Sequence, residues 1–473
     1  MSGSVAALDL GASSGRVVAG RITSTSIDSR VCARFTNRPV QIGNLLHWNA
    51  PQLWDGILDG VATALRTFPD IASLAVDTWG VDYGLFRHGR LLSLPVHYRD
   101  ARTASHVARV QGRVAASEIY SITGIQDLPI NTIYQLASDS DLVSLADNIL
   151  LLPDLFTYWL SGVRIAEKTM ASTTSLLDAT SHDWNDALLQ AAGVRRDQLP
   201  PLVSAGTIVG EITQQVAHRI GANQAINVIA TGAHDTASAV VAVPLADDGD
   251  AYISCGTWGL VGMERHSPVL TEDARAAGFT NECGVDDRTL FMRNTMGLWM
   301  LSELVRHHER DHGSVDLTEL LTQATAITSP LPIIDVDDPL FSPPGDMATR
   351  ITQWCEARSM PAPQSLPAMA RCIIESLAHT FSRVAHDAAQ LSGTTLRRII
   401  IVGGGSQNQL LCRLLASISG VEVAAGPAEA TALGSMLVQA RTMGFIDGDL
   451  GELRELVRRT HNVSVYNERS TPL

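Results

Sequence analysis

Two turns rich in glycine and hydroxyl residues constrain this chain most. The first covers residues 9–16 (DLGASSGR), and the second covers residues 254–257 (SCGT), about half a chain further on. Each directly follows a short apolar segment with the composition of a β-strand. Residues this small let backbone N–H groups and hydroxyls approach an anion closely. The repeated pattern therefore predicts two phosphate-binding turns, one in each half of the chain.

The first turn differs from the phosphate loop that opens a helix. No GxxxxGK[ST] sequence occurs, and residues 16–20 (RVVAG) continue as a second strand. We therefore predict that this turn closes a β-hairpin. A single turn of this composition between strands is most often only a hairpin turn, so the phosphate-binding interpretation depends on the second copy.

The length of the chain indicates more than one domain. A chain of 473 residues exceeds what a single core usually supports. The acidic segment 245–250 (LADDGD) directly follows Pro244 and precedes the second apolar strand. We therefore expect two domains, 1–246 and 247–473. The composition, with 45% hydrophobic and 18% charged residues, is that of a globular protein.

Charge and cysteine usage exclude several classes of function. The formal net charge of −14 argues against binding nucleic acid or an anionic membrane through a broad basic face. The start of the chain lacks the pattern of a signal peptide, so we expect a cytoplasmic protein with no membrane partner. The six cysteines show no CxxC spacing, which argues against a zinc site and a dense disulfide framework.

Helical patterns are predicted in three regions. Asn49 has the residue type of a helix cap, Pro51 suits the first turn, and apolar residues then recur at every fourth position. Residues 104–213 are mostly helical and rich in loops, as in an insertion. Residues 367–391 form a long helical stretch.

Polar residues or glycines follow three predicted strands. Asp77 follows strand 71–76, His234 and Asp235 follow strand 226–231, and three glycines (403–405) follow strand 397–402. In α/β proteins, ligands bind at the carboxyl ends of such strands. Glycines at a strand-to-helix turn also let a flat ligand lie against the backbone. These strand ends are therefore the candidate binding positions.

Two phosphate-binding turns, a glycine turn and an isolated acid suggest ATP held between two domains, and hence phosphoryl transfer. Asp235 is the candidate for accepting the proton of a sugar hydroxyl; the alternative is that it caps the helix that follows. Asp9 could hold Mg²⁺ through water, or could simply form the turn. Trp79 is a candidate for the apolar face of a sugar, or a core residue.

Many short motifs, in one order along nearly the whole chain, resemble the FGGY carbohydrate kinases of the actin-like ATPase superfamily. The segments that carry the resemblance are 9–16 (DLGASSGR), 77–82 (DTWGVD), 98–100 (YRD), 131–135 (NTIYQ), 152–154 (LPD), 234–239 (HDTASA), 256–258 (GTW), 281–282 (NE), 296–299 (MGLW), 403–405 (GGG), 426–427 (GP) and 429–430 (EA).

The resemblance implies an α/β fold of two actin-like (ribonuclease H-like) domains with an ATP and sugar cleft between them. The first domain would bind mainly sugar and the second mainly nucleotide, with Mg²⁺ as cofactor. Within the family, the pattern is nearest to members that phosphorylate L-rhamnulose at its 1-hydroxyl, with Asp235 as general base. The implied sugar contacts are Gly80, His234, Asp235, Thr236 and Asn294. The implied ATP contacts are Ala12, Ser13, Ser14, Gly15, Arg16, Thr257 and Gly404.

The chain departs from the family pattern at four positions. Ala233, Cys255 and Gly259 stand where serine is usual, and Ser302 stands where a nucleotide-contacting glutamine is expected. None of these removes a group that the chemistry requires. Cys355 and Cys372 resemble a pair that can be disulfide-linked in relatives, although a reducing cytosol argues against a permanent bond.

Three alternatives stay open from the sequence. The substrate could be another ketose, such as L-fuculose or a pentulose. The protein could instead be an actin-like nucleotide switch, or a sugar sensor that binds without phosphoryl transfer. The presence of Asp9, Asp235 and Thr257 favours a kinase over both non-enzymatic alternatives.

Overall fold

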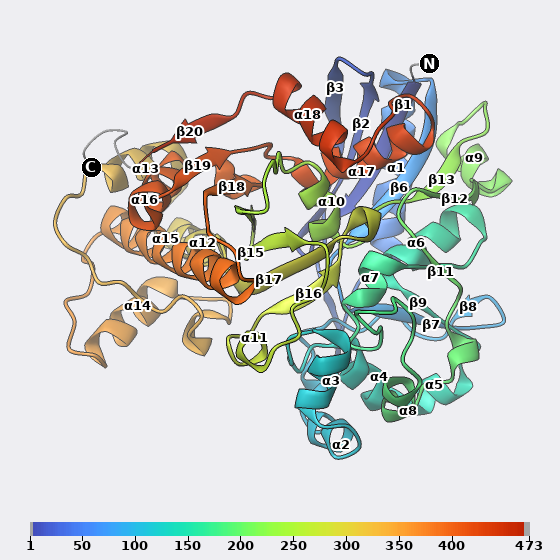
Figure 1. Ribbon diagram of the computed structural model, residues 1–473, viewed down its shortest axis with the longest axis horizontal. Coiled ribbons are helices and arrows are strands. Elements are labelled where there is room, and N and C mark those ends of the chain that lie inside the picture. Colours follow the sequence, from blue (N-terminus) through green and yellow to red (C-terminus); the bar gives the residue numbers. More distant parts are fainter. Residues whose placement is uncertain (1–2, 468–473) are drawn as a thin grey trace. The chain divides into compact units, whose positions relative to one another are not determined.

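The computed structural model describes residues 3–467, and the chain forms two compact units (Figure 1). The first unit consists of the residues up to Pro244, Glu264–Phe291 and Ala430–Thr460. The second consists of Leu245–Met263, Met292–Glu429 and the residues from His461 onward. Each unit thus combines segments that are distant in the sequence, and the continuous domains 1–246 and 247–473 stay a prediction.

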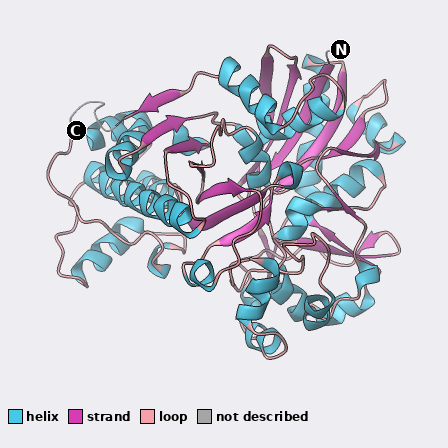
Figure 2. Ribbon diagram, viewed as in Figure 1, coloured by secondary structure: helices cyan, strands magenta, loops and turns pink. Residues whose placement is uncertain are grey.

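A six-stranded mixed sheet forms the centre of the first unit (Figure 2), with strand order β12-β13-β6-β1-β2-β3. Its strands are β1 (Gly3–Leu10), β2 (Ser14–Ile22), β3 (Ile27–Thr36), β6 (Ile71–Thr78), β12 (Thr207–Glu211) and β13 (Asn227–Ala230). β1 and β2 are antiparallel, which confirms the predicted hairpin. β6 runs parallel to β1, and β13 runs parallel to β6. The carboxyl ends of β1, β6 and β13 therefore meet at one edge of the sheet.

Thirteen α-helices of the described chain belong to the first unit. They are α1 (Ala50–Thr67), α2 (Val107–Gln111), α3 (Ala116–Thr123), α4 (Thr132–Ser138), α5 (Ser140–Leu145), α6 (Leu152–Ser161), α7 (Lys168–Ser172), α8 (Asp186–Ala192), α9 (Gln214–Ile220), α10 (Asp235–Val241), α11 (Glu272–Ala276), α17 (Ala430–Thr442) and α18 (Leu450–Thr460). α1 begins as predicted, because Asn49 Oδ1 accepts the Gln52 N–H at 3.2 Å. Its residues Leu53, Ile57 and Val61 are buried, and α1 packs against β2 and β3.

Helices are the main regular elements of the segment between residues 104 and 213, with loops between them, and the segment packs around a hydrophobic core that also includes Tyr83, Leu85, Ala233 and Cys283. Met170, Leu177 and Leu188 are buried in that core. The short strands of the first unit are β4 (Val40–Ile42), β5 (Leu45–His47), β7 (Tyr83–Arg87), β8 (Arg90–Leu91), β9 (Asn148–Leu151), β10 (Ala166–Glu167), β11 (Leu202–Val203) and β16 (Thr280–Cys283).

Helix α17 comes from near the end of the chain and packs beside β1, β6 and α10 (Figure 1). Its buried Gln439 accepts the Ser73 hydroxyl at 2.8 Å and donates to the Ala6 carbonyl at 3.1 Å. Gly434 allows the close approach to α10, because a Cβ at this position would lie 1.8 Å from the Ser238 carbonyl oxygen. α17 is therefore held in the core of the first unit by the hydrogen bonds of the Gln439 amide, and Gly434 provides the space for its close packing against α10.

The second unit repeats the arrangement of a hairpin beside parallel strands. Its strands follow the order β17-β15-β14-β18-β19-β20. They are β14 (Asp250–Cys255), β15 (Trp258–Arg265), β17 (Thr289–Met296), β18 (Arg398–Val402), β19 (Glu422–Ala425) and β20 (Ser464–Tyr466). β14 and β15 are antiparallel, and β14 is parallel to β18. The chain crosses from one unit to the other within β15 and β17.

The helices of the second unit include the long helix predicted from sequence. They are α12 (Trp299–His312), α13 (Leu317–Thr325), α14 (Met347–Glu356), α15 (Leu366–Leu391) and α16 (Gln409–Ser419). α15 begins where Ser365 accepts the Ala368 N–H at 3.3 Å. Both units combine a mixed sheet with helices, which confirms the expected α/β class.

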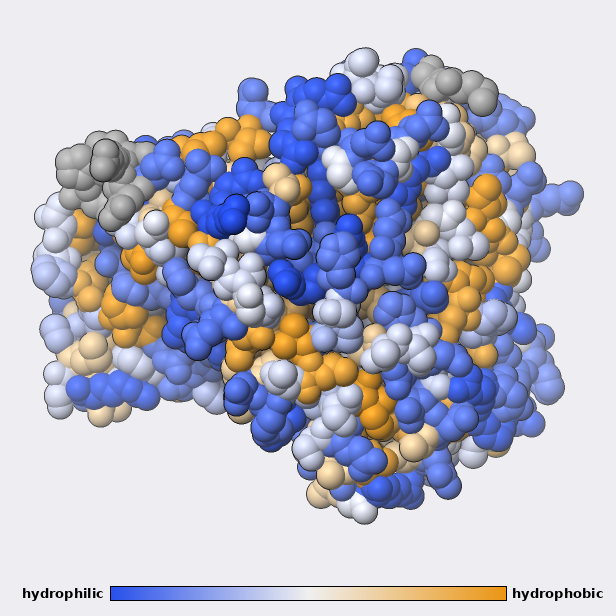
Figure 3. Space-filling model, viewed as in Figure 1, coloured by the Kyte–Doolittle hydropathy of each residue, from blue (hydrophilic) through white to orange (hydrophobic). Residues whose placement is uncertain are grey.

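The described residues show a mixed surface, no membrane-spanning helix and free cysteines. On the face shown in Figure 3, hydrophilic residues are interspersed with apolar ones. Among residues 3–467, none of the helices combines the length and apolar character needed to cross a membrane. All six cysteines are free thiols, including Cys355 and Cys372, and Cys372 Sγ donates to the Pro332 carbonyl at 3.1 Å.

Candidate active site

The first predicted phosphate-binding turn joins β1 to β2, and internal hydrogen bonds occupy its carbonyl groups. The Gly11 N–H donates to Ser14 O at 2.9 Å. Asn37 donates its backbone N–H to Ser13 O at 3.0 Å and its side-chain N–H to Gly11 O at 2.9 Å. Within the described part of the chain, the N–H groups of Ala12 and Ser13 have no hydrogen-bond partner. The turn thus offers donors rather than acceptors, as an anion site requires.

Three carboxylates gather at the carboxyl edge of the sheet in the first unit. Asp9 and Asp77 occupy paired positions on β1 and β6, and Asp235 follows β13. Arg16 lies opposite Asp9 in the hairpin, and its Nε donates to Asp9 Oδ2 at 2.7 Å. The guanidinium neutralises part of the negative charge that the three acids bring together.

Asp77 is the most deeply buried of these three acids. Both of its carboxylate oxygens are shielded from solvent without an aligned hydrogen bond among residues 3–467. Burial raises the pKa of Asp77 well above its ordinary value, and the negative charges of Asp9 and Asp235 raise it further. Arg16 and the hydroxyl of Ser435 act in the opposite direction. An orphaned acid of this kind holds a proton, or is neutralised by a cation at the edge of the sheet.

Asp235 is the first residue of α10. The cap position is His234, whose side chain makes no capping hydrogen bond. Asp235 therefore begins the helix rather than capping it. Its side chain is 33% exposed, and its Oδ1 accepts the Thr236 hydroxyl at 3.2 Å. The carboxylate is thus fixed by its neighbour yet open to a ligand.

The environment of Asp235 suits a group that accepts a proton. Burial raises its pKa above the ordinary value, while the His234 charge and two hydrogen bonds from Thr236 lower it. A carboxylate whose pKa lies nearer neutrality is a stronger base than an ordinary aspartate, provided that it stays ionised. The positive charge of His234 favours the ionised form of Asp235 and so opposes the effect of burial.

His234 lies between two carboxylates of the first unit. Its Nδ1 is 2.8 Å from Glu282 Oε2 on β16, and its Nε2 is 3.3 Å from Asp235 Oδ1. Both His234 and Glu282 have side chains only 8% exposed. Burial alone would lower the pKa of His234, but the close negative charge of Glu282, followed by the Asp235 charge, raises it to about 9. The imidazole is therefore cationic at neutral pH.

Glu167 connects the turn before α10 to the loop before α7. Its Oε2 accepts the Ala233 N–H at 3.2 Å, the Thr169 N–H at 2.9 Å and the Thr169 hydroxyl at 2.5 Å. Thr169 Oγ1 in turn accepts the His234 N–H at 3.2 Å. Burial raises the pKa of Glu167 to about 7, although hydrogen bonds to Thr169, Met170 and Ala233 oppose this. This network fixes the backbone on which His234 and Asp235 are carried.

The second predicted phosphate-binding turn lies between β14 and β15 in the second unit, and its carbonyl groups also accept hydrogen bonds from within the protein. The Gly256 carbonyl accepts the Leu298 N–H at 2.8 Å, and the Thr257 carbonyl accepts the Gly297 N–H at 3.2 Å. No partner is present for the Thr257 N–H within residues 3–467. Gly297 is required here, because a Cβ would lie 2.4 Å from the Trp258 carbonyl carbon. This turn, too, uses its acceptors internally and leaves a donor.

The glycine turn after β18 lies beside the second phosphate-binding turn. Ser254 on β14 pairs with Val402 on β18, so the segments that follow the two strands are neighbours. Gly403 has a φ of 78°, and a Cβ there would lie 2.8 Å from the Cys255 carbonyl oxygen. Gly404 is exposed at the start of the short helix Gly404–Gln407. The structure therefore places Gly404 and Thr257 at one end of the sheet in the second unit.

The remaining predicted site residues lie at identifiable positions. Gly80 follows β6, where a Cβ would lie 3.1 Å from the Thr173 hydroxyl. Asn294 is half-buried on β17, and Ser302 is exposed on α12. In the first unit, the residues that gather at the carboxyl edge of the sheet are Asp9, Ala12, Ser13, Ser14, Gly15, Arg16, Gly80, His234, Asp235 and Thr236.

Trp79 belongs to an aromatic cluster rather than to an open surface. Its side chain is 6% exposed, and its ring centroid lies 4.1 Å from that of Trp48. Both indole N–H groups donate to Asp82 Oδ2, at 2.8 Å from Trp79 and 2.6 Å from Trp48. Burial raises the pKa of Asp82 to about 6, against the lowering effect of these donors and of Gln135. The cluster supports the loop that carries Gly80.

A cavity of about 140 Å³ lies within the first unit, beside the predicted site. Residues 167–169 form part of its wall, together with His182 and Cys283. Lys168 is the single lysine of the chain. None of the predicted sugar or ATP contacts lines this cavity, which shares only Glu167 and Thr169 with the network behind the α10 turn.

Two donor-rich turns and a partly exposed carboxylate at the ends of two α/β sheets define a phosphotransferase. Comparison with known proteins identifies which one. The N-terminal domain model of the FGGY family of carbohydrate kinases matches residues 4–242, and the C-terminal domain model matches residues 251–443. The chain belongs to the FGGY family of carbohydrate kinases. It is an ATP-dependent sugar kinase.

The chain is similar to a rhamnulokinase of Bacteroides thetaiotaomicron, with 36% identity over 467 residues, which cover 98% of this chain and 95% of that protein. Two solved structures from Lactobacillus acidophilus, each 18% identical, have TM-scores of 0.78. The gluconate kinase is matched over 99% of this chain and 94% of its own. The ligand-bound xylulose kinase is matched over 98% of this chain and 93% of its own. These similarities confirm the two-domain actin-like fold.

Several residues that shape the site were not assigned a role from sequence. Asp77 and Glu282 lie in motifs that were noted, but only the fold shows that Asp77 lies opposite Asp9 and that Glu282 approaches His234. Asn37 and Glu167 gave no signal at all, because each acts through backbone groups of a distant segment. Of these four residues, only Asp77 had a local sequence signal for a place in the site, namely a polar residue at the end of a predicted strand.

Proposed function

We propose that this kinase transfers the γ-phosphoryl group of ATP to O1 of L-rhamnulose, with Asp235 as the general base. The observation that carries the proposal is the partly exposed Asp235 carboxylate at the start of α10, held beside a cationic His234. The substrate rests on the 36% identity to a rhamnulokinase over nearly the whole chain.

In the proposed reaction, Asp235 accepts the proton of the sugar hydroxyl as its oxygen attacks the γ-phosphorus, and ADP leaves with the electron pair of the broken P–O bond. His234, Thr236, Gly80 and Asn294 would contact the sugar. Thr236 already donates to Asp235 Oδ1, which leaves the second carboxylate oxygen for the substrate. The rigid backbone around His234 supports the precise positioning that phosphoryl transfer needs.

ATP would be held by the two donor-rich turns. The unpaired N–H groups of Ala12 and Ser13, the hydroxyl of Ser14 and the guanidinium of Arg16 would meet phosphate oxygens, with Gly15 keeping that turn compact. Thr257 and Gly404 would contribute from the second unit. Donors of this type stabilise the charge that develops on the transferred group.

Mg²⁺ fits the acidic edge of the first unit. Asp77 is buried without an aligned hydrogen bond among the described residues, and Asp9 lies beside it, paired with Arg16 in the hairpin. Asp9 would hold the ion through water, because Mg²⁺ keeps much of its hydration shell and needs few carboxylates. When bound, the ion neutralises charge on the phosphates of ATP.

The substrate assignment is tested by ADP release with Mg²⁺-ATP across L-rhamnulose, L-fuculose, L-xylulose, L-ribulose, D-xylulose and glycerol. We expect kcat/KM to be highest for L-rhamnulose. A higher kcat/KM for another ketose would support the kinase activity but assign a different substrate. No turnover with any acceptor would favour a nucleotide switch or a sugar sensor.

Replacing Arg16 with alanine is expected to raise KM for ATP by about 10-fold or more, because the charged donor contributes on the order of 1.5 kcal/mol to phosphate binding. KM for the sugar should stay within about twofold of the wild-type value. Arg21→Ala is the matched control, since Arg21 lies on the same strand and pairs with Asp70 at the surface. Equal ATP kinetics in the two variants would exclude Arg16 from the nucleotide site.

A further inference from the structure

Glu282 is a buried carboxylate for which the proposed reaction has no direct use. It lies on β16, and its direct effect on Asp235, the candidate base, is only a small one that raises the pKa of that carboxylate. Its Oε2 approaches His234 Nδ1 at 2.8 Å, and the opposite ring nitrogen, Nε2, lies 3.3 Å from Asp235 Oδ1. The three side chains therefore form a chain of alternating charge, carboxylate to imidazolium to carboxylate.

The contact between Glu282 and His234 is electrostatic and shielded from solvent. Each side chain is only 8% exposed, and the two atoms approach closely without the alignment of a hydrogen bond. Water screens such a pair weakly, so its influence on ring charge and position is larger than that of a surface pair. Removing one member leaves the other charge buried and uncompensated.

The backbone alone does not determine the orientation of the His234 ring. The His234 N–H donates to Thr169 Oγ1, which fixes the start of α10 but not the rotation of the imidazole. The side chain makes no capping bond to the helix. Glu282 is thus the group that holds Nδ1 on one side and directs Nε2 toward Asp235.

We propose that Glu282 is a positioning residue for phosphoryl transfer, which holds the His234 imidazolium against Asp235 and thereby keeps the base ionised and oriented. This inference rests on the proposed role of Asp235. Without the negative charge of Glu282, the buried imidazole loses its proton more easily and no longer lowers the pKa of Asp235.

The charges that act on His234 come from three directions. Glu282 on β16 and Asp235 on α10 face its ring nitrogens, and Glu167, at the end of β10, contributes at longer range. All three favour the cation, with Glu282 the strongest, and raise the pKa of His234 to about 9 against burial. The active form therefore has Asp235 ionised and His234 protonated.

The test is the pH profile of kcat in Glu282→Gln. The wild-type kcat should fall on the alkaline side as His234 loses its proton near pH 9. In Glu282→Gln, we expect this alkaline limb to move down by at least about one pH unit. We also expect kcat at pH 8 to fall about 10- to 100-fold, with KM for sugar and ATP within about threefold.

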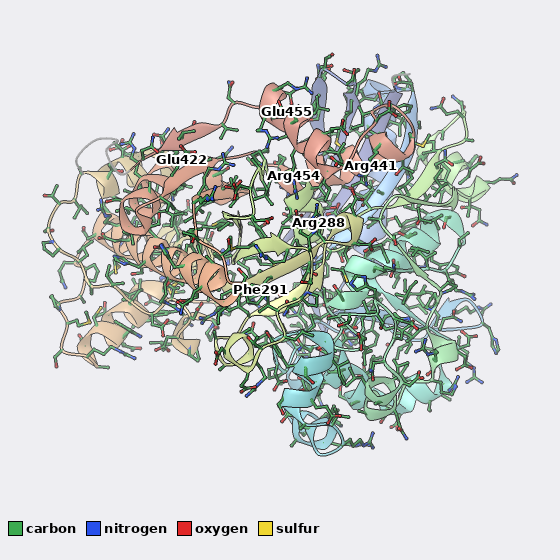
Figure 4. The ribbon with its side chains drawn as sticks, in the orientation of Figure 1. Arg288, Phe291, Glu422, Arg441, Arg454 and Glu455 are labelled. Carbon is green, nitrogen blue, oxygen red and sulfur yellow. The ribbon has the colours of Figure 1, made fainter. Side chains whose placement is uncertain are left out.

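Two further variants separate positioning from a purely structural role. Glu264→Gln is the matched control, because Glu264 also forms a shielded ion pair in the first unit, with Arg454 Nη2 at 2.7 Å. Arg454, on α18, is labelled in Figure 4. Glu264→Gln should lower stability without moving the alkaline limb. Glu282→Asp keeps the charge but shortens the side chain. Compared with Glu282→Gln, it should return the alkaline limb of the pH profile toward its wild-type position more fully than it returns kcat.

A direct titration of the His234 ring by NMR distinguishes failure of this inference from failure of the proposed function. A lower His234 pKa in Glu282→Gln is expected. An unchanged His234 pKa and alkaline limb in that variant would overturn the positioning role, even if Asp235→Asn proves inactive. Full turnover in Asp235→Asn would instead overturn the role of Asp235 as base, whatever Glu282→Gln does.

Discussion

Asp235→Asn is expected to lower kcat by about 10²- to 10⁴-fold, the range that general-base catalysis contributes. Asparagine has nearly the same shape and still accepts the Thr236 hydroxyl, so the start of α10 should keep its geometry. What is lost is the ability to take the proton of the sugar hydroxyl. Binding of sugar and of ATP, measured by calorimetry, should change by less than about 1 kcal/mol.

The pH dependence provides an independent check of this variant. Burial raises the pKa of Asp235 above its ordinary value, so wild-type kcat should decline on the acidic side at a higher pH than an ordinary aspartate would produce. The residual activity of Asp235→Asn should lack this acidic limb. Thr236→Ser is a useful control, because it keeps the hydroxyl next to Asp235. Retention of the acidic limb in Asp235→Asn would assign the base to another group.

Gly434→Ala is expected to have the largest effect on stability. In an isolated helix, this change would stabilise by about 1 kcal/mol, because alanine has the better helix propensity. In α17, the added Cβ would lie 1.8 Å from the Ser238 carbonyl oxygen and 2.8 Å from its carbonyl carbon. Backbone atoms of α10 cannot move aside like the end of a flexible side chain. We therefore expect the free energy of unfolding to fall by about 3 kcal/mol.

The measurement is urea unfolding followed by tryptophan fluorescence, with Gly451→Ala as the matched control. Gly451 lies in the first turn of α18, and a Cβ there would meet only the Asp449 side chain at 3.0 Å. That variant should stay within about 1 kcal/mol of the wild-type protein. Equal stability of Gly434→Ala and the wild-type protein would show that α17 and α10 separate easily.

The same variant links packing to catalysis. α10 carries Asp235 at its first residue and Ser238 one turn later, so a displacement of α10 by α17 also moves the base. We expect the fall in stability of Gly434→Ala to be accompanied by a loss of kcat, whereas Gly451→Ala should retain full activity.

Local sequence patterns predicted the elements that depend on neighbouring residues. The two hairpins, the cap of α1 at Asn49 and the long helix α15 all follow from composition and spacing within one segment. The acids at strand ends were also visible, because a buried strand followed by a polar residue is a local signal. Family membership, implied by many short motifs in order, is confirmed by the two family models.

By itself, then, the sequence determined the α/β class, the family and the candidate residues of the site. Only the tertiary structure decided which of these residues interact. Glu282 reaches His234 from another strand, Asn37 occupies the carbonyls of the first turn, and α17 enters the core of the first unit from near the end of the chain. Such contacts form between segments far apart in the sequence, and periodicity records only which face of an element is buried, not which partner covers it.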